Sequence, residues 1–117
     1  MEIICIDNFK SLYSTKEYNK NEIIYKLTGE ILSEPTRTSI EINENQHIED
    51  EYGQFMNHAF DPTCKIENGC IVTLKKITQH TELNFDYNSN ESKMSCPFID
   101  NLTKKYVKGK IYCDEKK

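Results

Sequence analysis

The sequence predicts a mostly β domain with little helix, in the β-rich part of the α+β class. Three observations lead to this prediction: short segments rich in β-branched and aromatic residues, turn-forming residues between them, and no sustained apolar stripe at the helical period of 3.6 residues. The expected strands cover residues 2–5, 12–14, 22–27, 38–42, 70–74 and 82–85. Residues 90–96 have room for one or two turns of helix.

The turn signals separate these strands along the chain. Breaks are expected at residues 18–21, 28–29, 34–35, 43–45 and 61–62, where Gly, Pro, Asn or other turn-forming residues occur. The strongest signal is Asn68-Gly69, since Asn-Gly favours the type I′ turn of a two-residue β-hairpin. We therefore expect residues 64–67 to pair with residues 70–74.

Length, composition and charge indicate one domain and restrict its partners. A chain of 117 residues with 37% hydrophobic residues supports a single modest core, so we expect one domain over residues 1–113 and a frayed end at 114–117. The net charge of −4 disfavours direct binding to nucleic acid and is compatible with a basic peptide partner. Neither a membrane-spanning run nor a signal-peptide pattern is found, which predicts an intracellular, soluble protein, cytoplasmic or in the host nucleus if viral or eukaryotic.

The cysteines and several other polar residues are interpreted as ordinary core or surface groups. The five cysteines, at positions 5, 64, 70, 96 and 113, are odd in number and form no CxxC pair, which indicates neither a disulfide framework nor a zinc knuckle. The open alternative is a metal site formed in space by the last four of them. His47, His80 and the acidic run at 49–51 are expected on the surface.

Two motifs in the second half of the chain are more specific. They are QFMNHAFDP at residues 54–62 and ELNFDYN at residues 82–88, with the expected hairpin between them. The pair resembles the two signatures of the SET domain, written roughly R-F-I-N-H-S-C-x-P-N and G-E-E-L-T-F-D-Y. Residues 12–14, 21–24 and 29–31 resemble the family's G-x-G-L-F-A, K-G-E-x-I and G-E-x-I segments in order and spacing, so the resemblance spans residues 9–113.

The resemblance implies the SET-domain fold, with short strands in several small sheets and a C-terminal pseudoknot. The core motifs occupy residues 9–88, and residues 97–113 resemble a post-SET tail without its zinc-binding cysteines. In the family's pseudoknot the two motif segments pass through one another's loop. This implies that Asn57 and His58 lie beside Tyr87.

The residue types in the two motifs suit a binding site. Asn57 and His58 precede a Pro-containing turn, and their polar groups can hold a purine edge and a ribose. An isolated Asn-His pair more often satisfies its own backbone, which is the alternative interpretation of this motif alone. Residues 82–87 alternate as a strand, with Leu83, Phe85 and Tyr87 on one face.

The resemblance also implies a function, that of an S-adenosylmethionine-dependent protein-lysine N-methyltransferase acting on a lysine-containing protein or peptide. Tyr87 matches the family's catalytic tyrosine, and Phe85, Tyr25 and Leu27 are expected to line the lysine channel. The expected cofactor-binding residues are Ser11, Leu12, Tyr13, Phe55, Asn57, His58 and Phe98. Phe85 occupies the family's Phe/Tyr switch position, which predicts the addition of more than one methyl group.

Several positions depart from the family pattern and leave a second hypothesis open. Phe9 and Ser11 replace the glycines of G-x-G, which let the backbone approach the cofactor. Gln54 replaces the arginine of the first motif, and Leu27 replaces a tyrosine. The alternative function is therefore a noncatalytic SET-like protein-binding module.

Structural zinc is not expected, so metal ligands are assigned to no residue. The cysteine that follows N-H-S in the family is replaced by Phe60, and no cysteine lies between residues 98 and 109, where the post-SET tail supplies the other ligands. Four aromatic residues are expected to pack the tail instead: Phe60, Phe98, Tyr106 and Tyr112. We expect a monomer or a homodimer.

Overall fold

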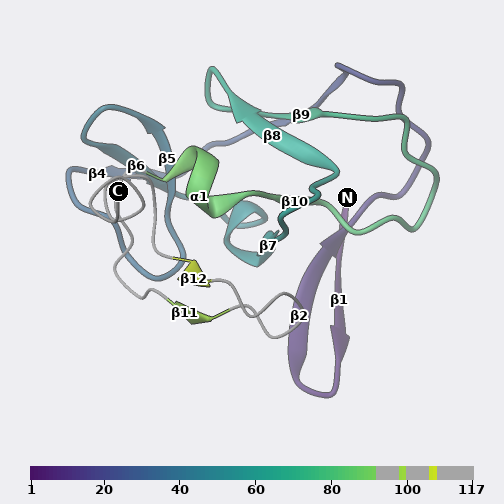
Figure 1. The fold of residues 1–117 in the computed structure, drawn as a ribbon, viewed down its shortest axis with the longest axis horizontal. Helices are drawn as coiled ribbons and strands as arrows, with labels where there is room; N and C mark the ends of the chain where they lie inside the picture. Colours follow the sequence, from purple (N-terminus) through teal and green to yellow (C-terminus); the bar gives the residue numbers. More distant parts are fainter. Residues whose placement is uncertain (92–97, 100–105, 108–117) are drawn as a thin grey trace.

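The computed structural model describes residues 1–91 and the backbone of residues 98–99 and 106–107 (Figure 1). Short strands dominate this part of the chain, together with a 3-10 turn, η1 (Gly53–Phe55), and a short helix, α1 (Tyr87–Asn90). The strands are β1 (Glu2–Ile6), β2 (Phe9–Tyr13), β3 (Ile23–Lys26), β4 (Glu30–Leu32), β5 (Ile40–Asn43), β6 (Gln46–Glu49), β7 (Asn57–His58), β8 (Cys64–Glu67), β9 (Cys70–Thr73), β10 (Asn84–Phe85), β11 (Phe98–Ile99) and β12 (Tyr106–Val107). The predicted β-rich fold class is confirmed.

The strands form several small sheets, as the SET-domain resemblance implies. β4, β6 and β5 form one antiparallel sheet, and β3, β9 and β8 form another. β1 pairs with β2, β11 pairs with β12, and β7 pairs in parallel with β10. In Figure 1 the β1–β2 hairpin projects from the body, whereas β7 and β10 lie near the centre of the view.

The hairpin predicted at Asn68-Gly69 is confirmed. β8 and β9 pair antiparallel, with Glu67 opposite Cys70. The two turn residues both have positive φ angles, 52° for Asn68 and 75° for Gly69. Positive φ at both central positions is the requirement of a type I′ turn, which Asn and Gly meet at low energetic cost.

The strands expected at 2–5 and 12–14 are both longer in the structure, and they form a hairpin. β2 begins at Phe9, before the expected strand at 12–14, and it pairs with β1 through a turn at Asp7-Asn8. Those two residues have φ angles of 52° and 67°, and Asp and Asn are the non-glycine residues that tolerate this left-handed conformation best. Asp7-Asn8 is therefore the turn signal of this hairpin, which the expected turns did not include.

The second motif changes from strand to helix earlier than predicted. The strand expected at 82–85 is β10, which begins at Asn84 and ends at Phe85, although the strand-like alternation continues to Tyr87, where α1 begins. Asp86 causes this change, because its carboxylate accepts a hydrogen bond from the Asn88 N–H at 2.9 Å and caps the helix. α1 ends at Asn90, so it overlaps the possible helix at 90–96 by one residue, and residues 92–96 lie outside the described residues.

One apolar core joins the two halves of the chain. Its buried members are Leu12, Tyr18, Leu27, Ile40, Ile48, Met56, Cys64, Ile71, Ile77, Leu83 and Phe85. Burial of each large apolar side chain contributes about 1.5–3 kcal/mol to stability. Met56 from the first motif and Leu83 and Phe85 from the second belong to this cluster, so core packing fixes both motifs in position.

Asp50 is a buried structural carboxylate, which corrects the prediction that residues 49–51 form a solvated run. Asp50 is only 2% exposed. Oδ1 accepts the N–H groups of Tyr52 and Gly53, both at 2.8 Å, and Oδ2 accepts the Thr28 N–H at 2.7 Å and the Tyr25 hydroxyl at 2.9 Å. One carboxylate therefore joins the end of β3 to the start of η1.

Gly29 lies where two backbone segments come too close for a side chain. A Cβ atom at this position would lie 1.9 Å from the carbonyl oxygen of Glu49. The absence of a side chain lets β4 start against β6, where Glu30 pairs with Glu49. This contact gives a steric reason for the glycine of the Gly29-Glu30 segment.

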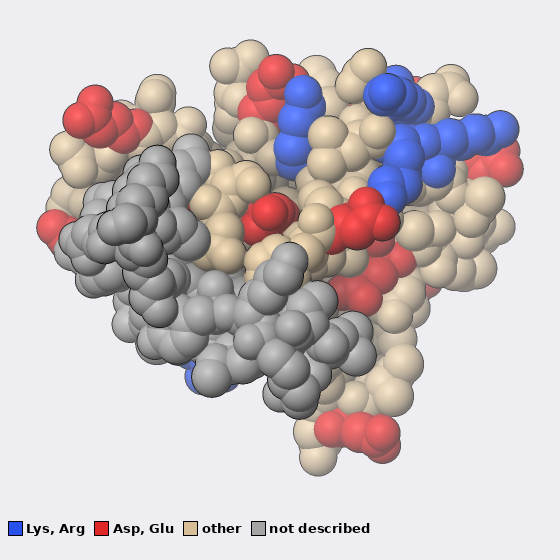
Figure 2. Space-filling view, in the orientation of Figure 1, with Lys and Arg blue, Asp and Glu red and all other residues tan. Residues whose placement is uncertain are grey.

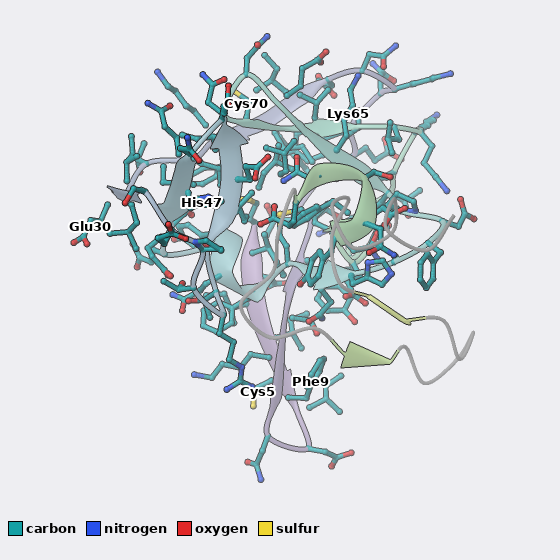
Figure 3. The ribbon with its side chains drawn as sticks, turned by 60° about the vertical axis from the view of Figure 1, so that its left-hand side comes forward. Cys5, Phe9, Glu30, His47, Lys65 and Cys70 are labelled. Carbon is teal, nitrogen blue, oxygen red and sulfur yellow. The ribbon has the colours of Figure 1, made fainter. Side chains whose placement is uncertain are left out.

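His47 is also buried, contrary to the predicted surface position. It is 5% exposed and lies on β6, the central strand of its sheet, opposite Leu32 on β4 and Glu41 on β5 (Figure 3). Within residues 1–91, its Nδ1 atom is buried without a hydrogen-bond partner. His80 is exposed, as predicted, and its Nδ1 lies 3.5 Å from Glu2.

The helices in the described part of the chain are short. None of them has the length and apolar character needed to cross a membrane.

We predict that Asp50→Asn lowers the free energy of unfolding by about 2–4 kcal/mol. Both carboxylate oxygens accept hydrogen bonds from backbone N–H groups, and in asparagine one of these oxygens becomes an NH₂ group, which cannot accept them. Urea denaturation followed by circular dichroism measures this change. Asp61→Asn is the matched control, since the Asp61 side chain is 98% exposed and only its contact with Lys75 would be lost. Equal stability of the two variants would contradict the role given to Asp50.

Candidate active site

The site is built on the parallel pair of β7 and β10. Asn57 lies opposite Asn84 and His58 opposite Phe85, and the Ala59 N–H donates to the Phe85 carbonyl oxygen at 3.1 Å. These two strands carry the two sequence motifs. The predicted proximity of the motifs is therefore present in the structure.

Tyr87 is held at both its backbone and its hydroxyl group. Its N–H donates to His58 Nδ1 at 3.0 Å, and its hydroxyl donates to the Met56 carbonyl oxygen at 2.5 Å. Because Nδ1 is the acceptor, the neutral tautomer of His58 carries its proton on Nε2. The Tyr87 ring centroid lies 5.2 Å from that of His58 and 4.8 Å from that of Phe85.

The surroundings keep the Tyr87 hydroxyl protonated. Burial is the largest effect and raises the pKa of Tyr87 far above 10, and the negative charges of Glu91 and Glu82 raise it further. The phenol is therefore a neutral hydrogen-bonding group at physiological pH. It does not act as a general base there, since a base must be available in its deprotonated form.

Asn57 links β7 to β2 and to the start of the second motif. Its Nδ2 group donates to Ser11 Oγ at 2.9 Å and to Glu82 Oε2 at 3.0 Å. Two predicted cofactor-binding residues, Ser11 and Asn57, are thus in direct contact. With both Nδ2 hydrogens used inside the protein, the acceptor Oδ1 is the group of this amide suited to a ligand donor.

Glu82 is a member of this site to which sequence reasoning gave no role. It is half-buried and lies opposite Tyr13 in an isolated β-bridge. It stands in the second motif at a position where the family also has glutamate, so the motif itself contained the signal. Only the three-dimensional contact with Asn57 shows where the carboxylate acts.

The other predicted cofactor-binding residues take different positions. Leu12 is fully buried in the core, and its carbonyl oxygen accepts the Leu83 N–H at 2.8 Å. Tyr13 is half-buried and lies opposite Glu82 in the β-bridge. The Lys10 Nζ atom lies over the Phe55 ring, 5.5 Å from the ring centroid. Phe98 starts β11, and its side chain lies outside the described residues.

The predicted lysine-channel residues all contact the same core cluster. Phe85 is 3% exposed and lies beside Tyr87, and Leu27 is 4% exposed. Tyr25 packs at the edge of the core, with its ring 5.6 Å from that of Tyr52 and its hydroxyl on Asp50. Burial is the largest of several effects that raise the pKa of Tyr25, so this hydroxyl also stays protonated near neutral pH.

A pocket of about 340 Å³ lies between β8 and α1 and has Phe85 among its lining residues. Its lining combines apolar and polar residues: Phe60, Pro62, Cys64, Lys65, Ile66, Leu74, Phe85, Asp86, Ser89 and Asn90. Figure 2 shows that basic side chains gather at one corner of this face of the molecule, with acidic side chains beside them.

The described cysteines do not gather into one site. Cys5 is exposed on the β1–β2 hairpin, Cys64 is buried in the core, and Cys70 is partly exposed (Figure 3). Burial raises the pKa of the Cys64 thiol to about 11, so it remains a neutral core group. Within residues 1–91, no three His, Cys, Asp or Glu side chains converge as metal ligands, and Cys96 and Cys113 lie outside the described residues.

Comparison with known proteins identifies the family of the chain. The model of the SET domain family matches residues 9–88, which is well over half of the chain and includes both motifs. A comparison with curated proteins found no match. The matched residues coincide with the core motifs assigned from the sequence, and they carry β2 to β10 and the start of α1. The chain therefore belongs to the SET-domain family.

Proposed function

We propose that this protein is an S-adenosylmethionine-dependent protein-lysine N-methyltransferase. The observation that carries the proposal is the placement of Tyr87, which β7 and β10 hold beside His58, with its hydroxyl bonded to the Met56 carbonyl oxygen. The membership of the SET-domain family supports the same function. The proposed substrate is a lysine-containing protein or peptide, with a basic peptide favoured by the net charge of −4.

The residues around Asn57 fit the proposed methyl donor. S-Adenosylmethionine carries hydrogen-bond donors on its adenine and amino-acid ends and a positive charge on sulfur. The Asn57 amide presents its oxygen as an acceptor, while Glu82 adds a negative charge next to it. These acceptors, with the negative charge of Glu82, would suit a polar, cationic ligand that donates hydrogen bonds.

When bound, the donor would supply a sulfonium methyl group: the neutral amine forms the new N–C bond, the C–S bond breaks with its electron pair going to sulfur, and the products are a methylammonium ion and a neutral thioether. The protein's contribution to such a displacement is alignment of the two reactants. Tyr87 suits this task because its position is fixed by contacts with three neighbours: His58, Phe85 and Met56.

The Tyr87 oxygen would act as a hydrogen-bond acceptor. Its proton is used in the bond to Met56, so the oxygen lone pairs can face the polarised methyl hydrogens. Each such weak C–H contact contributes about 0.5–1 kcal/mol. A protonated tyrosine also avoids placing a phenolate, a competing nucleophile, next to the methyl donor.

The apolar surroundings of Tyr87 would help to deliver the lysine in its neutral form. A lysine ammonium has a pKa near 10.4 in water, about three units above physiological pH. Desolvation against the rings of Phe85 and Tyr87 and the nearby sulfonium charge both lower that pKa. The proton is lost to solvent, since the Tyr87 hydroxyl is already protonated.

Replacement of Tyr87 by Phe is the direct test of the proposed function. We expect Tyr87→Phe to reduce methylation by roughly 10²-fold or more, because the oxygen that orients the methyl group is removed. Incorporation of labelled methyl groups into lysine-containing peptides and whole lysate measures the change. Tyr18→Phe is the matched control, since Tyr18 is a core residue in the bridge to Ile77 and lies outside the proposed site. Equal labelling by the parent and Tyr87→Phe would remove Tyr87 from the mechanism.

A binding measurement separates the enzyme from the noncatalytic binding module. We expect S-adenosylmethionine at about 100 times its dissociation constant to stabilise the folded protein by roughly 2.7 kcal/mol, because it binds only the native state. Thermal unfolding with and without the ligand measures this shift. Asn57→Ala should lose most of it. A parent protein with no shift at saturating ligand would favour the binding module.

Phe85 sets the expected number of methyl groups. We predict that the parent adds more than one methyl group, whereas Phe85→Tyr stops earlier, because the new hydroxyl takes space beside Tyr87 and can hydrogen-bond to the amine. Mass spectrometry of the modified peptide gives the product distribution. Phe9→Tyr is the matched control, since Phe9 is 62% exposed on the hairpin. A parent limited to one methyl group, with an unchanged distribution in Phe85→Tyr, would refute this role.

A further inference from the structure

Glu82 is a charged group without an opposite charge in the described structure. Its Oε2 accepts only the neutral Asn57 amide, at 3.0 Å. Among residues 1–91, the ion pairs with Lys or His involve other acidic residues: Asp86, Glu67, Asp61 and Glu2. A half-buried carboxylate of this kind is poorly compensated, since desolvation costs free energy that one neutral hydrogen bond only partly offsets.

Neither the first motif nor the contacts of Glu82 within residues 1–91 supply a positive charge. Gln54 stands where the first motif of the family has arginine, and its Nε2 donates to the Glu51 carbonyl oxygen at 3.1 Å. The contacts of Glu82 in the described part of the chain are with neutral groups: its carboxylate accepts the Asn57 amide, its carbonyl oxygen accepts the Thr63 hydroxyl at 2.9 Å, and it lies opposite Tyr13 in a β-bridge. Next to Asn57 the site therefore has a negative charge that a cationic ligand bound there would compensate.

We propose that Glu82 is the counter-charge for the methyl donor, so that the site binds the sulfonium form of the ligand more tightly than its thioether product. The inference rests on the proposed function and extends it to ligand discrimination. The two ligands have nearly the same shape and differ by one methyl group and one unit of charge. A fixed carboxylate distinguishes them by charge, which shape complementarity alone cannot do.

The same charge difference has a consequence for turnover. During methyl transfer the positive charge leaves sulfur and appears on the methylated amine. The attraction between Glu82 and the spent ligand is then lost, which weakens product binding relative to the methyl donor. The pKa of the Tyr87 hydroxyl is raised chiefly by burial, then by the charge of Glu91 and then by that of Glu82.

Charge neutralisation at Glu82 tests the proposal by binding alone. In Glu82→Gln the side-chain oxygen can still accept the Asn57 N–H, so the hydrogen bond is retained and the charge is removed. Isothermal titration with S-adenosylmethionine and S-adenosylhomocysteine should show a loss of roughly fivefold in affinity for the first and less than about twofold for the second. Glu82→Asp, which keeps the charge, should retain more of the preference.

The controls distinguish charge from position. Glu30→Gln makes the same change in net charge on β4, at an outer edge of the molecule (Figure 3), and should leave both affinities unchanged. Added salt should reduce the ratio of the parent's affinities for S-adenosylmethionine and S-adenosylhomocysteine, because it screens the charge of Glu82. The same ratio in Glu82→Gln should change little. Thermal unfolding confirms that each variant is folded.

The outcomes separate the two proposals. An equal loss of affinity for both ligands in Glu82→Gln, or no loss for either, overturns the counter-charge and leaves the proposed function intact. A parent that binds neither ligand overturns the proposed function and the counter-charge together. A selective loss for the sulfonium ligand supports the counter-charge.

Discussion

The pairing of β7 with β10 is the contact on which the site depends. Each strand has only two residues, and parallel strands need a long connection, which here includes the β8–β9 hairpin. Closing such a connection costs conformational free energy, and the few hydrogen bonds between two short strands offset only a small part of that cost. Met56, Leu83 and Phe85 supply the remainder by burial in the common core, so the site and the core form together.

Local signals predicted the parts of the structure that local sequence determines. The hairpin at Asn68-Gly69 and the burial of Leu83 and Phe85 follow from turn chemistry and strand alternation, which involve only neighbouring residues. The two motifs also predicted that His58 lies beside Tyr87, as the hydrogen bond between them shows. This prediction came from the family resemblance, because the periodicity of a single sequence indicates local strands but not which distant strands pair.

The contacts that sequence could not predict are tertiary hydrogen bonds of polar residues. Asp50 and His47 are polar residue types, which most often lie on the surface, yet both are buried in this fold. Asp50 is compensated by backbone N–H groups and a tyrosine hydroxyl from separate segments, and nothing in the sequence around it indicates those partners. Glu82 is similar, since its role follows from the position of Asn57.

The contact between Ser11 and Asn57 changes the meaning of a departure from the family pattern. Ser11 replaces a glycine, but its hydroxyl accepts one of the two Nδ2 hydrogens of Asn57, so the serine has become a structural partner. Restoring glycine at this position would leave that N–H without its acceptor and allow the amide to rotate. The side chains at 11, 57 and 82 therefore form one coupled unit, in which the effect of a substitution at one position depends on the residues at the other two.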